Sequence, residues 1–245
     1  MRMKLWGTPL VLAAALTIIP AAPASAYKAG EVKGGGSISG VIKFDGEAPK
    51  PKKFSVNKDK KVCGKKDIFS ETLSVKDGGV QWAVVSLKGV ESGKEWGGLS
   101  KAVIDQKGCI YKAHITVMKA GSRLLVKNSD KILHNVHTYP GKTKNPTANI
   151  AQPKFKKKLK MKKRYFKKAG IVGLKCDVHD WMNGYVVVAD SPYSVVSGEG
   201  GKFKLTDVPA GSYTLEVWHE TLGTKSVEVT VKGGADAEVD VTFEK

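Results

Sequence analysis

Hydrophobic and polar residues alternate with a period of two through much of the chain, which is typical of half-buried β-strands. The alternation is regular in residues 37–44, and again in residues 212–218, 225–231 and 237–243 near the end. Residues 80–87 are more continuously apolar and predict one buried strand. Turns rich in Gly, Pro and Asp separate these runs, and no helix of ordinary length is indicated beyond the N-terminal segment. The sequence therefore predicts an all-β fold.

A second group of strands is expected in the middle of the chain. Residues 115–118 and 123–127 are short apolar runs that lead towards His134. Residues 169–175 and 183–188 contain β-branched or aromatic runs on either side of a short loop. We expect that loop to lie at the rim of a β-sandwich.

The loop contains Cys176, His179 and Met182, which offer a thiolate, an imidazole and a thioether. His134, at the end of a distant predicted strand, can add a second imidazole. Two His and one Cys in a trigonal plane, with a weak axial Met, are the donors of a mononuclear copper site for electron transfer. We therefore predict that these four residues bind one copper ion.

These motifs resemble those of the cupredoxins, most closely the amicyanin-like group. The resemblance rests on Leu-His-Asn-Val-His at residues 133–137 and Cys-x-x-His-x-x-Met at residues 176–182, and it covers roughly residues 105–190. It implies a Greek-key domain in which the same four residues are type 1 (blue) copper ligands. It also implies that Asn135 ties the two ligand loops together. Asp180 departs from the pattern, because relatives commonly carry Pro there.

The sequence also suggests positions for the aromatic and imidazole side chains outside the predicted ligand set. We expect Trp181 to be partly exposed or interdomain, in an apolar docking patch around an exposed imidazole edge of His179 through which electrons pass. A core position is the alternative for the tryptophan. His137 is expected to be structural or at the surface. His114 and His219 are expected to be hydrogen-bonded structural residues, with His219 near a contact between domains.

The C-terminal strands resemble the carboxypeptidase regulatory-like (transthyretin-like) module. Its Gly-x-Phe-x-Leu and Val-Pro-x-Gly-x-Tyr patterns occur at residues 201–205 and 208–213. Such a module begins with two strands like those predicted near the N-terminus. We therefore predict one discontinuous Ig/transthyretin-like sandwich, formed by residues 37–98 and 193–245, with the cupredoxin-like domain of residues 105–190 inserted into it.

The first 26 residues are expected to be a signal peptide. They contain a basic start, an apolar run over residues 5–19 and Ala-Ser-Ala at residues 24–26. The apolar run is interrupted by Gly7 and Pro9, and it is short for a membrane span. The sequence thus predicts an exported protein, either periplasmic or extracellular.

The chain is strongly basic, with 41 Lys and Arg against 23 Asp and Glu and a formal charge of +18. Such a field favours anionic partners and steers their approach. Because export separates the protein from nucleic acid, we expect an acidic redox protein, such as a cytochrome or a copper-dependent oxidoreductase. Peripheral contact with an anionic membrane or cell-wall surface is a further expectation. Residues 154–168 carry ten basic residues, interleaved with apolar ones of which Phe155, Leu159 and Met161 fit the buried face of a strand. The basic residues indicate either a docking surface or a solvated strand face.

Three cysteines in an exported chain suggest one disulfide and one remaining thiol. A Cys63–Cys109 bridge would leave Cys176 for the metal, although pairings that involve Cys176 stay open. The contrary interpretation of the motif is a buried cysteine beside surface histidines and a core methionine. It leaves the odd cysteine unexplained.

The sequence therefore favours an exported blue copper protein that carries single electrons between redox partners. No nucleophile–base pair or carboxylate pair suited to hydrolysis is evident, so we expect a protein that is not an enzyme. The alternatives are copper binding and delivery, an open-site copper enzyme, and a structural or surface-binding β-sandwich module.

Overall fold

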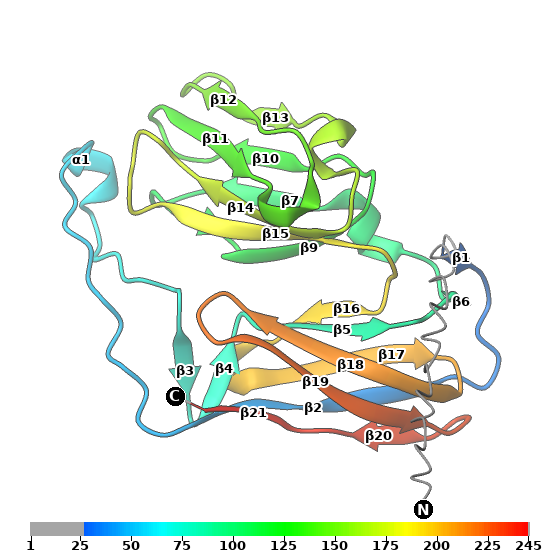
Figure 1. Ribbon diagram of the computed structural model, residues 1–245. Helices are drawn as coiled ribbons and strands as arrows, with labels where there is room; N and C mark the ends of the chain where they lie inside the picture. Colours follow the sequence, from blue (N-terminus) through cyan, green and yellow to red (C-terminus); the bar gives the residue numbers. More distant parts are fainter. Residues whose placement is uncertain (1–26, 245) are drawn as a thin grey trace, which may run out of the picture.

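The computed structural model describes residues 27–244, and most of their regular structure is β-strand (Figure 1). The all-β prediction is confirmed: the strands form two packed domains, which we call the upper and lower domains from their places in Figure 1. The predicted signal peptide lies outside the described residues. Within residues 27–244, no helix is long and apolar enough to cross a membrane.

The lower domain is a sandwich of two sheets built from both ends of the described chain. One sheet has the order β16-β5-β18-β19, and the other is centred on β2, which pairs with β17, β4, β20 and β21. Its core joins residues from both ends, for example Ile38, Leu87 and Leu215. The strands are β2 (Gly36–Asp45), β3 (Ser74–Lys76), β4 (Gly79–Gln81), β5 (Val84–Lys88), β16 (Ser194–Val196), β17 (Lys202–Val208), β18 (Gly211–His219), β19 (Gly223–Val231), β20 (Asp236–Glu238) and β21 (Val241–Glu244).

The upper domain also consists of two sheets, with the orders β13-β10-β7-β8 and β12-β11-β14-β15-β9. The pairs β10–β7 and β15–β9 are parallel, and the other pairs of these two sheets are antiparallel. The strands are β7 (Val103–Gln106), β8 (Tyr111–Lys112), β9 (Ile115–Lys119), β10 (Leu125–Asn128), β11 (His134–Tyr139), β12 (Asn149–Gln152), β13 (Lys158–Lys160), β14 (Gly170–Lys175) and β15 (Asn183–Ala189).

The remaining elements are short. They are the parallel pair β1 (Lys28–Ala29) and β6 (Ser92–Gly93), the helix α1 (Lys60–Cys63), and the 3-10 turns η1 (Gly97–Lys101), η2 (Gly141–Thr143), η3 (Lys163–Phe166) and η4 (Glu199–Gly201).

The prediction of a single strand over residues 80–87 is wrong, because the chain changes sheet within this run. β4 pairs with β2 and β3, whereas β5 pairs with β16 and β18. Trp82 lies at the break with a φ of +67°, in the left-handed region that interrupts a strand. Both halves are apolar because both face the same core, so the hydrophobic pattern alone does not show the break.

Between β2 and β3 the chain leaves the lower domain and reaches the upper one (Figure 1). This excursion is closed at its base, where the N–H of Phe54 donates to the carbonyl of Ile68 at 2.8 Å. Near its tip, Cys63 forms the expected disulfide with Cys109 of the upper domain. Residues 54–68, which we call the cap, were assigned from sequence to the lower sandwich. They pack instead against the core of the upper domain.

The two domains meet through a small apolar cluster that includes Val84, Ile115 and Trp218. A buried hydrogen bond crosses the same boundary, between Nε2 of His114 and the carboxylate of Glu220. His219, beside that glutamate, is fully buried, and its Nδ1 accepts hydrogen bonds from the backbone of the following turn. The two lone histidines are therefore structural, as expected.

Burial of His219 lowers the pKa of its imidazole to about 4. In the unfolded chain an imidazole titrates near pH 6.5, so between about pH 6.5 and 4 the unfolded state binds more protons than the folded one. The free energy of unfolding should therefore fall as the pH falls through this window. His219→Gln should remove up to about 3 kcal/mol of this dependence. Urea denaturation at a series of pH values measures it, and equal pH slopes for the two proteins would contradict the assignment.

Candidate metal centre

Three of the four predicted copper ligands meet at one end of the upper domain. His134 is the first residue of β11, and Cys176 directly follows β14. The two strands are antiparallel, with His137 opposite Lys175, so the start of one lies beside the end of the other. His179 follows in the turn that leads to β15. The ligating atoms of His134, Cys176 and His179 lie within 4.8 Å of one another, and all three residues are buried.

The two rings present the same nitrogen to the centre. Nδ1 of His134 lies 3.1 Å from Nδ1 of His179, and Sγ of Cys176 lies 3.9 Å and 3.7 Å from these two atoms. Metal–nitrogen and metal–sulfur bonds of about 2.0 and 2.3 Å at trigonal angles would give nitrogen–nitrogen and nitrogen–sulfur separations of about 3.5 Å and 3.7 Å. The observed triangle therefore needs only small shifts to hold one transition-metal ion.

Met182 belongs to the same compact turn. Its N–H donates to the carbonyl of His179 at 2.9 Å, and its own carbonyl accepts from the N–H of Cys176 at 3.0 Å. The residue is fully buried. The loop of residues 176–182 is thus closed on itself by backbone hydrogen bonds, and the axial role of Met182 stays a prediction.

Both rings are fixed from outside the triangle by carboxylates. Nε2 of His134 donates to Oδ2 of Asp130 at 3.0 Å, and Nε2 of His179 donates to Oδ2 of Asp59 at 3.0 Å. Asp130 is itself anchored, because its oxygens accept from the backbone N–H groups of Gly108 and Cys109 at 2.9 Å each. Such partners fix the tautomer and orientation of a metal-binding histidine. Here they leave both Nδ1 atoms free to face Cys176.

Asn135 connects the two ligand loops, as the cupredoxin resemblance implies. Its Oδ1 accepts from the N–H of Asp177 at 2.6 Å, and its Nδ2 donates to the carboxylate of the same residue at 3.0 Å. His137 hydrogen-bonds to Asp177 as well and lies outside the ligand triangle. Its expected structural role agrees with this position.

The hydrogen bonds of the site also set its protonation. Burial raises the pKa of the Cys176 thiol, but hydrogen bonds with His134 and His179 lower it by more, so that the pKa is about 6. Burial lowers the pKa of His134, whereas its hydrogen bonds with Asp130 and Cys176 raise it by more. The site therefore favours a thiolate, which is the form that binds a soft metal.

The expectation that Trp181 is partly exposed is wrong, and so is that of an exposed edge on His179. Trp181 is 4% exposed, its Nε1 donates to the carbonyl of Cys109 at 3.1 Å, and His179 is 0% exposed. Both are covered because the cap brings Asp59 and the disulfide over the loop. Asp59 is 120 residues from His179 in sequence, so no local pattern identifies it.

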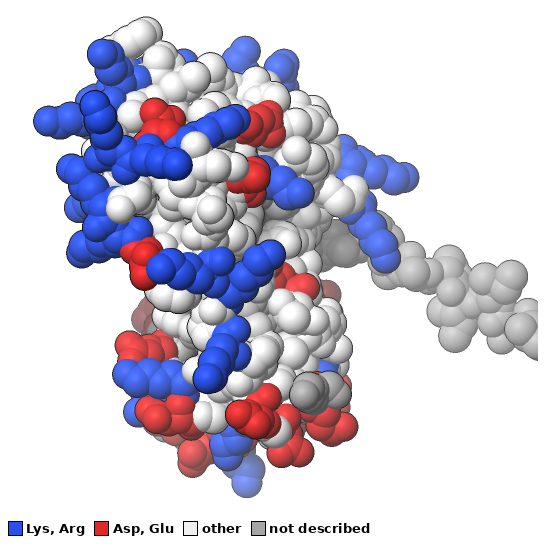
Figure 2. All heavy atoms as spheres, turned by 90° about the vertical axis from the view of Figure 1, so that its left-hand side faces the viewer, with Lys and Arg blue, Asp and Glu red and all other residues white. Residues whose placement is uncertain are grey.

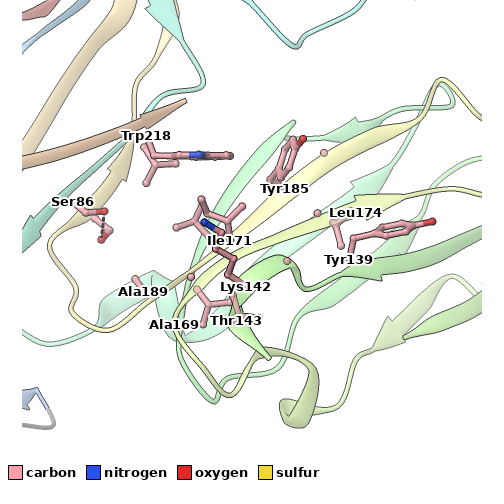
Figure 3. A pocket seen from close by; sticks show the side chains of 18 of the residues that line it. Ser86, Tyr139, Lys142, Thr143, Ala169, Ile171, Leu174, Tyr185, Ala189 and Trp218 are labelled. Atoms are coloured by element: carbon pink, nitrogen blue, oxygen red, sulfur yellow. Dashed lines mark hydrogen bonds between the residues drawn. The ribbon is translucent and has the colours of Figure 1, made fainter. Parts of the chain in front are cut away.

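A groove of about 740 Å³ lies elsewhere, between the two domains (Figure 3). Its walls include Tyr185 and Ile171 from the upper domain and Trp218 from the lower domain. None of the three converging ligands lines it. The candidate metal centre and the groove are therefore separate features.

Comparison with known proteins supports the interpretation of the C-terminal strands. A family model of the carboxypeptidase regulatory-like domain matches residues 181–244, which confirms the resemblance seen in the C-terminal strands. No curated protein sequence matches the chain.

The similar solved structures include cupredoxins. A mutant of amicyanin in its Cu(I) form is 21% identical, with a TM-score of 0.31 over 43% of this chain and 98% of that chain. A purple cupredoxin from Nitrosopumilus maritimus is 18% identical, with a TM-score of 0.27 over 36% of this chain and 100% of that one. A copper-containing nitrite reductase from Thermus scotoductus SA-01 is 19% identical, with a TM-score of 0.27 over 36% of this chain and 22% of that chain. The assignment of the metal centre therefore depends on the geometry of this chain's own residues.

Replacing Cys63 and Cys109 by serine should both destabilise the protein and uncover the site. The disulfide joins residues 46 apart in sequence, and in the chain-entropy model a loop of that length contributes about 4 kcal/mol to the free energy of unfolding. Urea denaturation measures this loss.

In the metal-free protein, modification by diethylpyrocarbonate, located by mass spectrometry, reports the access of reagent to His179. We expect faster modification of His179 in the double variant, with the partly exposed His137 as an internal control. An unchanged rate at His179 would show that the cap stays in place without the disulfide.

Proposed function

We propose that this chain is an exported, mononuclear type 1 copper protein that carries single electrons between redox partners. The observation that supports it is the convergence of Sγ of Cys176 with Nδ1 of His134 and of His179. A soft thiolate with two imidazoles is a donor set suited to copper in both oxidation states. A copper ion bound there would supply a one-electron redox couple.

The residues around the triangle suit repeated electron transfer, because they leave the ligands little freedom to move. Asp130 and Asp59 each hold one imidazole ring through Nε2. Backbone hydrogen bonds fix the turn between Cys176 and Met182. Ligands held in one arrangement change little when an electron arrives or leaves, which favours fast exchange.

We infer an electron carrier and not an enzyme, because the ligand triangle is enclosed. His134 and His179 are fully buried and Cys176 nearly so, which leaves a small-molecule substrate no direct approach to the ligand atoms. The same enclosure disfavours copper delivery, which requires ready release of the ion. The formal charge, +16 once residues 1–26 with Arg2 and Lys4 are removed, supports an acidic redox partner. The N-terminal sequence supports a periplasmic or extracellular location.

The absorption and EPR spectra of the copper-loaded mature protein test this proposal. We expect an intense visible thiolate-to-Cu(II) band with narrow copper hyperfine splitting. Cys176→Ser should abolish the band, because it removes the thiolate. His137→Gln should retain it, since His137 lies outside the triangle. A colourless oxidised copper protein would refute the assignment.

Two additions to the same sample separate the alternatives. Azide should leave the band unchanged in an electron carrier, whereas an open-site enzyme would bind it and shift the spectrum. A strong Cu(I) chelator should remove copper slowly from the reduced protein, whereas rapid loss would favour the delivery role. If Cys176→Ser leaves the cellular function intact, the chain is a structural or surface-binding module.

A further inference from the structure

The cap lies between the candidate metal centre and solvent. His179 is completely buried, yet its Nε2 donates to the carboxylate of Asp59, whose side chain is 40% exposed. One hydrogen bond and one side chain thus link the buried ring to the surface of the cap. The cap replaces the exposed imidazole edge that the sequence suggested as the point of electron exit.

The other ring has no comparable link. His134 donates to Asp130, whose side chain is itself largely buried. Both carboxylate oxygens of Asp130 are occupied by hydrogen bonds from Gly108, Cys109 and His134. A partner that contacts the cap at Asp59 would therefore be one hydrogen bond away from a ligand ring, that of His179.

The outer surface of the cap is basic. It carries five exposed lysines, Lys58, Lys60, Lys61, Lys65 and Lys66. The two acids of the cap are committed elsewhere, because Asp59 binds His179 and Asp67 lies 2.8 Å from Lys53. Five lysines against two aspartates leave a local charge of +3.

The basic surface continues beyond the cap. Nζ of Lys157, in the lysine-rich segment of residues 154–168, donates to the carbonyl of Asp130 at 3.3 Å, which brings the start of that segment to the metal end of the domain. Phe155, expected from sequence on the buried face of a strand, is 80% exposed in the turn beside it. Figure 2 views the molecule from the side of α1. On the face shown, lysine and arginine spread over the upper domain among a few acidic side chains, while acidic side chains gather on the lower domain.

We propose that the outer surface of the cap is the docking face on which an acidic redox protein exchanges electrons with the metal centre. This inference rests on the proposed copper function. In each encounter one electron passes between the centre and the partner, so one is oxidised as the other is reduced. No bond forms or breaks, and no proton is transferred. A charged rim over a short route to the buried site suits a transient complex, in which electrostatic steering sets the rate of association.

The first test locates the anion-binding face without copper. Hexacyanochromate(III) is a redox-inert, paramagnetic trianion that broadens the NMR signals of nearby amides. Added to the metal-free protein, it should broaden residues 57–66 most. Strongest broadening at residues 162–168, or broadening without preference, would overturn the docking face. Co-sedimentation with vesicles of phosphatidylcholine and phosphatidylglycerol that depends on the cap lysines would replace the acidic protein by a membrane and overturn the proposal as well.

The second test measures electron transfer with matched variants. Lys58→Gln/Lys60→Gln/Lys61→Gln removes three charges from the cap. The control, Lys162→Gln/Lys163→Gln/Lys167→Gln, removes three exposed charges near the start of β14. That end of the strand lies about 20 Å from the Cys176 end. Stopped-flow oxidation of the reduced copper protein by hexacyanoferrate(III) supplies the rate constant.

At low ionic strength the cap variant should react about tenfold more slowly than wild type, and the control within about twofold. The difference should shrink as salt screens the charges. Equal slowing in the two variants would refute the docking face. A protein with the copper band but no broadening at the cap would overturn this inference alone. A protein with broadening at the cap but no copper band would overturn the electron exchange together with the proposed function.

Discussion

Antiparallel pairing of β11 with β14 is the constraint on which the candidate metal centre depends. The pairing sets the start of one strand beside the end of the other, so His134 and Cys176 become neighbours although they are 42 residues apart. A slip by one residue would turn one of the two side chains to the opposite face of the sheet. The buried residues of both strands resist such a slip, because Val136, Val172 and Leu174 belong to the core of the upper domain. Packing of an apolar core thus specifies the geometry of a polar site.

The strands bring the ligand residues together, and hydrogen bonds from outside the triangle fix the orientation of the two imidazole rings. Asp130 reaches His134 from the preceding turn, and Asp59 reaches His179 from a segment that belongs in sequence to the other domain. Burying two imidazoles, a thiol and a carboxylate is costly unless each finds a partner, and these contacts supply the partners. The cap is therefore part of the centre as well as its cover. The charge on its outer face and the hydrogen bond on its inner face belong to one short stretch of chain.

Local patterns in the sequence predicted much of this structure. Alternation identified β2, β18 and β19 because one face of each strand is more deeply buried than the other. The Cys-x-x-His spacing identified two residues of the triangle because a tight loop holds them, and odd cysteine number favoured the disulfide that forms. The break at Trp82 was missed because both sides of it are equally apolar. The cap was missed because its lysines have the composition of a solvated loop, and its contact with His179 joins residues 120 positions apart. Phe155 was misplaced because its spacing from Leu159 fits a strand face, while the strand begins only at Lys158.

The bridge between Cys63 and Cys109 closes a covalent ring that runs through both halves of the molecule. Starting at Cys63, the backbone descends into the lower domain, forms β3, β4 and β5, and returns to Cys109 in the upper domain before the sulfur bond completes the circuit. A protease that cuts the connection around η1 would open this circuit without freeing either half, since the disulfide and the chain after β15 still join them. A single proteolytic cut at this connection therefore leaves the two domains covalently joined.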